Sequence, residues 1–228
     1  MAAQLTATSL VDAAHAAMWQ KIVTTPGYGG TLVTEVGVAA EYGIARPTAK
    51  AVVERLITDG LLVRDGRRGA RVPLLTEPDV RDIYWNRLLL ETEAHTLLAR
   101  AGAVPVDARL ANQQMRLHAE ADDRAHTVAA DIAFHRRLVE AAGSIRLAKL
   151  HAVIMAEAHF CMGQVQAQHL LPSDVSLSEH QGILDAITAR DVELVVQRTH
   201  EHLERGRDSL ITGMFPPQAA AAATAAGE

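Results

Sequence analysis

The sequence predicts a mainly α-helical protein, with an N-terminal winged helix-turn-helix and a C-terminal all-α bundle of six to seven helices. Residues 31–72 carry, in order, signals for a helix, a turn, a helix and a hairpin. Nearly every stretch after Asp79 has helical character. The chain is 49% hydrophobic but only 4% aromatic, so its core must be aliphatic, and the Ala- and Leu-rich stretches favour helix.

The N-terminal elements follow from local patterns. An amphipathic helix is expected over residues 9–25, and the glycine-rich segment 26–30 breaks it. A short helix (34–41), a sharp turn (42–44), a second helix from Arg46 to Gly60, an apolar strand (61–63) and a hairpin (64–72) follow. The strands are expected to end with this two-stranded wing. In such motifs the second helix enters the major groove of DNA.

The remainder predicts helices joined by short breaks. Residues 73–78 form a linker with two prolines, which cannot lie inside a helix. Helices are expected near 79–101, 106–123, 126–142, 145–170, 175–189 and 191–213. The expected organisation is a DNA-binding domain at 1–75, a helical effector-binding and dimerisation domain at 76–215, and a disordered, alanine-rich tail at 216–228.

Charge is divided unevenly between the two parts. The whole chain carries a net charge of −5, but residues 1–75 hold eight basic and six acidic side chains. Residues 45–72 alone hold seven basic and three acidic side chains. This gathers positive charge on the second helix and the wing, as a phosphate backbone requires. The excess is modest, so tight binding is expected to need two copies of the domain.

Other features limit the class of protein. There is no apolar run of transmembrane length and no secretory signal, and Cys161 is the only cysteine, so a cytoplasmic protein without membrane association is expected. No zinc-protease motif, nucleophile elbow or phosphate-binding loop is present, and Cys161 has no evident activating partner. We therefore expect a protein that is not an enzyme.

Four residues of the second half have the spacing of a metal site. Asp131 and His135 are four residues apart and share one helix face, while His180 and His202 lie on the next two predicted helices after an intervening one. One carboxylate and three imidazoles suit a divalent ion such as Zn, Ni, Mn or Fe(II). Glu179 or Asp185 could orient one of these ligands by accepting a hydrogen bond from it.

This pattern has an ordinary explanation as well. An Asp-x-x-x-His pair is common and is more often a surface contact. His200 lies on the same helix as His202, so one of the two is expected to face solvent. The other histidines, apart from His15, are expected on the surface or in ordinary packing: His95, His118, His126, His151, His159 and His169.

Motifs in both halves resemble one family. The first half contains Gly43-Ile44-Ala45-Arg46-Pro47-Thr48-Ala49-Lys50, Leu56-Ile57-Thr58-Asp59-Gly60-Leu61-Leu62 and Gly69-Ala70-Arg71-Val72. The second contains Arg87-Leu88-Leu89-Leu90-Glu91, Asp131-Ile132-Ala133-Phe134-His135, Glu179-His180-Gln181-Gly182-Ile183-Leu184-Asp185-Ala186-Ile187, and Asp191 followed by His202-Leu203. Over residues 10–213 the chain resembles GntR-family transcription regulators of the FadR subfamily with an FCD-type effector domain.

The resemblance implies roles for matching residues. DNA contacts are implied for Arg46, Thr48 and Lys50 on the second helix and for Gly66, Arg67 and Gly69 in the wing. Metal ligation is implied for Asp131, His135, His180 and His202, and effector binding for Arg87. The chain departs from the family pattern at Ala45, where a capping Ser or Thr is usual, and at Lys50, where arginine is frequent.

The resulting expectation is a homodimeric, ligand-responsive repressor that binds a pseudo-palindromic operator in double-stranded DNA. It would sense a small carboxylate effector through a divalent metal. A guanidinium such as that of Arg87 can hold a carboxylate, although a pair with Glu91 is the ordinary alternative. A metal-free regulator that binds acyl-CoA or another bulky ligand, and a metal-dependent hydrolase, remain alternatives.

Overall fold

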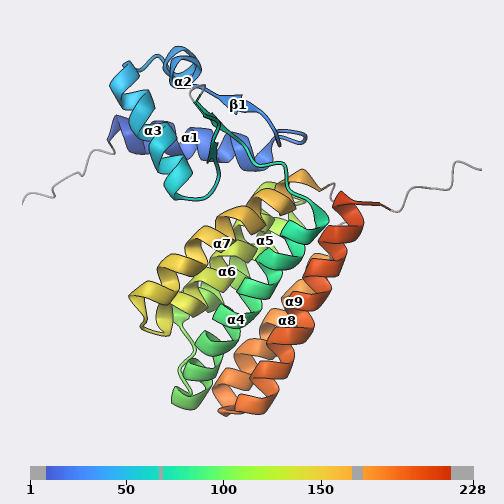
Figure 1. Cartoon of the computed structure of the whole chain (residues 1–228). Coiled ribbons are helices and arrows are strands. Elements are labelled where there is room, and N and C mark those ends of the chain that lie inside the picture. The colour runs from blue at the N-terminus through green and yellow to red at the C-terminus, as the bar shows by residue number, and fades with distance from the viewer. Residues whose placement is uncertain (1–8, 67–68, 166–171, 217–228) are drawn as a thin grey trace, which may run out of the picture.

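The computed structural model describes residues 9–66, 69–165 and 172–216. Its first part contains helices α1 (Leu10–Thr24), α2 (Glu35–Tyr42) and α3 (Arg46–Thr58) and short strands β1 (Leu32–Val33), β2 (Val63–Arg64) and β3 (Ala70–Arg71). Six further helices follow in the described residues. They are α4 (Glu77–Ala101), α5 (Val106–Glu120), α6 (Arg124–Ala141), α7 (Ile145–Gln164), α8 (Ser173–Ala189) and α9 (Val192–Met214). Figure 1 shows the small N-terminal part above a bundle of long helices.

The first part is a winged helix-turn-helix. Gly43, with φ of 62°, ends α2 in the left-handed conformation and allows the sharp turn into α3. The apolar sides of α1 and α3 pack together around Met18, Ile22, Val52 and Leu56. The fold class expected from the sequence is therefore confirmed.

Two strand predictions were wrong. The strand expected at 61–63 lies at Val63–Arg64, because Leu61 and Leu62 turn into the apolar core and are almost fully buried. The sheet also has three strands rather than two, in the order β1-β3-β2, with both pairs antiparallel. The added strand is β1, which pairs Val33 with Ala70.

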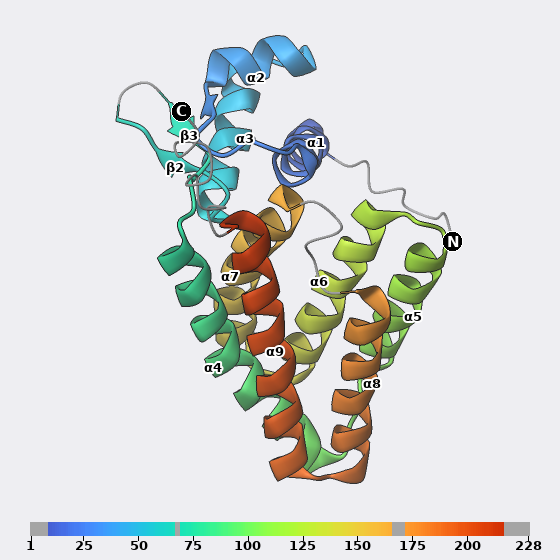
Figure 2. The same ribbon diagram turned by 90° about the vertical axis from the view of Figure 1, so that its right-hand side faces the viewer.

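The six bundle helices form a closed ring in which α4 contacts α9, then α8, α5, α6 and α7 follow in turn, and α7 contacts α4 again. Helix α4 also contacts α6 and α8 across the ring. Figure 2 shows the long helices running along one common direction. Polar side chains that point inward from several helices can therefore meet in the middle of the bundle.

The first part rests on α7. Ala156 and Phe160 of α7 belong to the same buried apolar cluster as Ile22 and Leu56. Gln164 donates a hydrogen bond from Nε2 to the carbonyl oxygen of Thr25 at 3.1 Å. No helix of the described residues has the length and apolar character needed to span a membrane.

Some expected boundaries were inaccurate. Helix α7 ends at Gln164, whereas the sequence predicted a helix to residue 170, and residues 166–171 lie outside the described residues. Pro172 precedes α8, which begins two residues earlier than expected. The tail expected to be disordered lies, apart from Pro216, outside the described residues.

Candidate metal centre and nucleic-acid interface

The N-terminus of α3 is open toward solvent. Ala45 precedes the helix and supplies no side-chain cap, and Pro47 lies in the first turn. The free N–H groups and the helix dipole therefore favour a negative group at this end. Arg46 and Lys50 are exposed and Thr48 is half-buried, and no hydrogen bond or ion pair involves them within the described residues.

The other basic side chains that the structure describes in this part are already paired. Arg55 contacts Asp12, Arg64 contacts Glu54, and Arg71 contacts Asp65, while Lys21 contacts Glu41. Arg46 and Lys50 therefore have their charges available, which is the condition for contacting phosphates or base edges.

The wing depends on two glycines with positive φ. Gly66 is exposed with φ of 55°, and Gly69 has φ of 126°. A Cβ built on Gly69 would lie 2.8 Å from the carbonyl oxygen of Val33, so only glycine allows this approach to β1. Arg67, a predicted DNA contact, lies outside the described residues.

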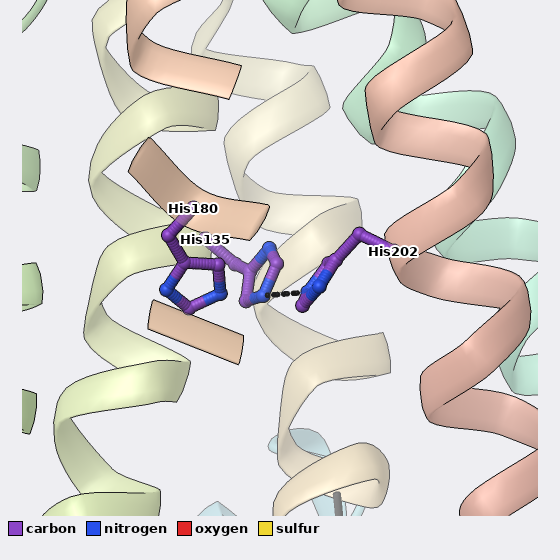
Figure 3. A group of neighbouring side chains, drawn as sticks. All are labelled: His135, His180 and His202. Carbon is purple, nitrogen blue, oxygen red and sulfur yellow. Dashed lines mark hydrogen bonds between the residues drawn. The ribbon is translucent and has the colours of Figure 1, made fainter. Parts of the chain in front are cut away.

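Three buried imidazoles meet in the middle of the bundle. His135 projects from α6, His180 from α8 and His202 from α9, and each offers one ring nitrogen within 4.8 Å of the others (Figure 3). We call these residues the three-histidine cluster. Asp131 lies beside it, with Oδ1 3.5 Å from His180 Nε2 and Oδ2 4.0 Å from His135 Nε2. The structure thus brings together all four residues that the spacing singled out.

Each imidazole of the cluster makes a hydrogen bond at Nδ1 to an oxygen atom of a neighbouring side chain. His135 Nδ1 lies 2.7 Å from Glu91 Oε2, His202 Nδ1 lies 2.8 Å from Glu179 Oε2, and His180 Nδ1 lies 3.1 Å from Asn112 Oδ1. These oxygens can only accept, so each Nδ1 carries the proton and donates. Each Nε2 therefore presents a lone pair toward the centre, as in histidines that bind metals.

The Nε2 atoms face one another and Asp131. His135 Nε2 and His202 Nε2 are 3.1 Å apart, which is a hydrogen-bond distance (Figure 3), but in two neutral rings protonated at Nδ1 it would bring two lone pairs together. His180 Nε2 is buried and has no hydrogen-bond partner among the described residues. Burial lowers the pKa of His180 well below its usual value, with the neighbouring imidazoles adding to the shift, and burial also lowers the pKa of His135. Three imidazole nitrogens beside one carboxylate fit a divalent cation, which would bind to all of them.

Glu91 connects this centre to two other helices. Its carboxylate accepts from Arg87 Nε at 2.8 Å, from His135 Nδ1 at 2.7 Å and from His151 Nε2 at 3.1 Å. Burial by itself would raise the pKa of Glu91, but the charge of Arg87 and the contact with His135 hold that pKa well below its usual range. Glu91 is therefore a buried carboxylate anion.

A cavity of about 170 Å³ opens beside the cluster. Arg87, Asp131 and His202 line it together with Arg124 and both hydroxyl and apolar side chains. Arg87 forms the pair with Glu91 that the sequence left as an alternative, yet its Nη2 is buried without a partner. Arg87 can therefore keep the Glu91 contact and still donate to a ligand.

Sequence reasoning missed several supporting residues. Glu179, not Asp185, supports the cluster, because Asp185 is exposed and accepts from Gln181. Asn112 and His151 had no spacing signal, since their partners lie on other helices. Cys161 is buried and its pKa is raised to about 12 by burial, which does not favour a nucleophilic thiol.

Comparison with known proteins agrees with this architecture. The FCD domain model matches residues 82–205. The gluconate operon transcriptional repressor of Bacillus subtilis (strain 168) is 25% identical over 194 residues, which cover 79% of this chain and 76% of the relative. A protein of Paenarthrobacter nicotinovorans, named as a probable D-xylose utilization operon transcriptional repressor, is 28% identical over 175 residues, with 76% of each chain covered.

Solved structures share the fold. A chain from Rhodococcus sp. RHA1, solved under the name of a GntR transcriptional regulator, superposes with a TM-score of 0.76 at 21% identity, covering 88% of this chain and 97% of the other. The E. coli protein McbR/YncC gives a TM-score of 0.75 at 14% identity and covers 90% and 99% of the two chains. With the domain match and the named relatives, the winged helix-turn-helix and the helical bundle place this protein: it belongs to the GntR family of transcriptional regulators that carry an FCD domain.

Proposed function

We propose that this GntR-family regulator is a metal-containing repressor released from its operator by a small organic acid. Two copies would bind a pseudo-palindromic site, because a two-fold dimer presents two recognition helices. Arg46, Thr48 and Lys50 at the start of α3 would contact the major groove, with Gly66, Arg67 and Gly69 of the wing beside it. The unpaired charges of Arg46 and Lys50 support this assignment.

The observation that carries the sensing proposal is the convergence of three Nε2 lone pairs and one carboxylate at a single buried point. Asp131, His135, His180 and His202 would hold a divalent ion, for which Zn, Ni and Mn suit this ligand set. The ion, when bound, supplies a Lewis-acidic position for a carboxylate oxygen. Glu91, Asn112 and Glu179 keep the imidazoles in the ligating tautomer.

The cavity supports a small effector. An engineered protein cavity of about 150 Å³ holds benzene, so about 170 Å³ suits a molecule of similar or slightly larger size. Acyl-CoA is far larger and is disfavoured. Arg87 would bind the effector's carboxylate through its free Nη2. The named relatives, which repress gluconate and xylose operons, support a small polar metabolite.

Metal analysis tests the sensing half. The double variant His180→Ala/His202→Ala removes two proposed ligands, so we expect elemental analysis to find metal in the wild type and none in the variant. The matched control His159→Ala/His200→Ala removes two histidines that belong to no candidate metal-binding group of the described residues, and it should keep the metal. Full metal content in the first variant would contradict the proposed site.

Operator binding tests the other half. Arg46→Ala should weaken binding in a gel-shift assay by about 5- to 150-fold for each recognition helix, because a guanidinium contact to guanine contributes about 1–3 kcal/mol. Arg81→Ala, an exposed change in α4 at an arginine paired with Glu77, is the control and should bind normally. Unchanged affinity of Arg46→Ala would argue against α3 as the recognition helix.

A further inference from the structure

We infer that the effector carries two anionic groups, and that Arg124 binds the second one. This inference rests on the proposed function, in which the metal and Arg87 hold the first carboxylate. It assigns a specificity-determining role to a residue that neither the metal site nor the DNA interface requires. The chemical class that follows is a short dicarboxylic acid.

Arg124 is a half-buried cation with no carboxylate partner among the described residues. It is the first residue of α6, and its Nη2 donates to the carbonyl oxygen of Met162 at 3.0 Å and to that of Val165. Its Nε atom is buried and has no hydrogen-bond partner in the described part of the chain. Burial lowers its pKa, and no carboxylate opposes that shift within the described residues. Asp123, the preceding residue, is instead bonded to His126.

The other cationic group of the cavity differs in this respect. Arg87 lines the same cavity, but Glu91 accepts from it at 2.8 Å and balances its charge. Arg87 is also 1% exposed, so it is fixed in place before any ligand arrives. Both guanidinium groups keep one buried nitrogen without a hydrogen-bond partner among the described residues, and each such donor costs free energy until something accepts from it.

Charge balance indicates how many anionic groups are missing. A divalent ion, Arg87 and Arg124 would supply four positive charges around the cavity, while Asp131 and Glu91 supply two negative ones. Glu179 behind His202 adds a negative charge, but Arg205 pairs with it and balances it. Asp122 also lines the cavity, but it is exposed, so solvent screens its charge. Two positive charges therefore remain at a partly buried site, where uncompensated charge costs more than on an open surface. A dianion neutralises them.

The size of the cavity sets the length of the dianion. A volume of about 170 Å³ suits a molecule with about six to ten non-hydrogen atoms, by comparison with benzene in a cavity of about 150 Å³. Dicarboxylic acids of about four to six carbon atoms have this size. Thr127 and Ser176 also line the cavity with hydroxyl groups, and Val128 and Leu210 line it with apolar side chains that can contact a hydrocarbon chain.

The test compares matched acids on the metal-loaded, full-length protein. Calorimetric titrations would use succinate, glutarate and adipate against butyrate, valerate and hexanoate, which keep the chain length but lose one carboxylate. We expect at least one dicarboxylate to bind tenfold or more tightly than its monocarboxylate partner. Arg124→Gln should reduce that dicarboxylate to the affinity of the monocarboxylate, whose own binding stays unchanged.

Two further variants distinguish the loss of positive charge at Arg124 from damage to the folded protein. Arg124→Lys keeps the positive charge and should keep most of the preference. Arg116→Gln removes an exposed arginine of α5 that does not line this cavity, and it should bind like the wild type. Metal content and thermal melting of each variant show that the bundle is intact.

The outcomes distinguish this inference from the proposed function. Equal binding of the paired acids by the wild type would overturn the role of Arg124 and leave a one-carboxylate sensor standing. A preference that persists in Arg124→Gln would also overturn it. Binding of none of the six acids to metal-loaded protein would overturn acid sensing in this size range, and the dianion inference with it.

Discussion

At the scale of single residues, the buried histidines of the bundle differ in the groups that surround their Nε2 atoms. His95 is fully buried, and its Nδ1 donates to Thr199 Oγ1 at 2.8 Å, since that hydroxyl already donates to a carbonyl oxygen. Its Nε2 is buried without a partner, as is that of His180. His95 belongs to no group of three or more ligand side chains among the described residues, so nothing there indicates a metal site.

His95 should instead make stability depend on pH. Burial lowers its pKa to about 3 in the folded protein, while an unfolded chain has the ordinary value near 6.5. Below that value the unfolded chain binds a proton that the folded protein does not, so stability falls as the pH falls from 6.5 toward 3. At pH 5 this loss is about 2 kcal/mol relative to pH 7.

The variant His95→Leu isolates this contribution in urea unfolding measured at pH 7 and pH 5. Between pH 7 and pH 5 the wild type should lose about 2 kcal/mol of unfolding free energy that the variant does not lose. The difference in unfolding free energy between the two proteins should therefore change by about 2 kcal/mol in favour of the variant, whatever that difference is at pH 7. Equal pH dependence of His95→Leu and the wild type would show that His95 is protonated in the folded protein.

The sequence predicted the clustering of four polar residues better than their surroundings. Asp131 and His135 are one helical turn apart, so helix geometry alone puts them on one face. Whether His180 and His202 join them depends on how α8 and α9 pack, an outcome that the spacing suggested and the resemblance to a known family favoured. Asn112 and His151 could not be found, because each contacts its partner across 68 and 60 residues of chain, respectively.

At the scale of elements, long helices were predicted within a few residues and short strands were not. Helices such as α9 have a capping residue, Asp191, and more than twenty residues of apolar periodicity. β1 has two residues, too few for any alternation to appear, and it exists because β3 lies beside it. The predicted position of β2 was too early in the chain. The run of apolar residues from Leu61 to Val63 does not indicate which of these side chains enter the core and which belong to a strand.

The contact between α7 and α1 leaves no room for a side chain at Gly163. Gly163, near the end of α7, faces the backbone of α1, and a Cβ built on it would lie 1.5 Å from the carbonyl oxygen of Val23. Gly163→Ala must therefore move α1 away from α7. We expect a loss of about 1–3 kcal/mol in the free energy of unfolding, and a red shift in the fluorescence of Trp19 on α1.

Gly182→Ala is the matched control for Gly163→Ala. Gly182 also lies inside a helix, α8, but a Cβ there would meet only the side chain of Arg198 at 3.8 Å. Alanine has the higher helix propensity, so this variant should gain up to about 1 kcal/mol. A Gly163→Ala variant as stable as Gly182→Ala, with unshifted Trp19 emission, would show that α1 and α7 are not packed this closely.

At the scale of the whole molecule, α7 is the element that contacts both the candidate metal centre and the DNA-binding part. Toward the centre, His151 donates to Glu91, which in turn holds His135. Two residues further along, Val153 lies against the turn after α3, where a Cβ on Gly60 would be 3.0 Å from it. Figure 1 shows the C-terminal end of α7 beneath the winged part. A shift of Glu91 on effector binding could therefore reach the recognition helix through one rigid helix.

This arrangement predicts that His151→Leu separates sensing from DNA binding. The change removes the link between Glu91 and α7, while Glu91 keeps Arg87 and His135, so metal content and operator affinity without effector should stay near wild type. Coupling between two sites is typically 1–3 kcal/mol, or about 5- to 150-fold in affinity. The fold-change in operator affinity caused by a bound dicarboxylate should fall toward one in this variant.

Two control variants test whether the hydrogen bond itself matters. His151→Gln retains a donor and should restore part of the response, whereas Leu150→Ala, an exposed neighbour, should leave it intact. Because binding of the acid is measured separately by calorimetry, an undiminished response in His151→Leu would mean that the signal reaches α3 by another route.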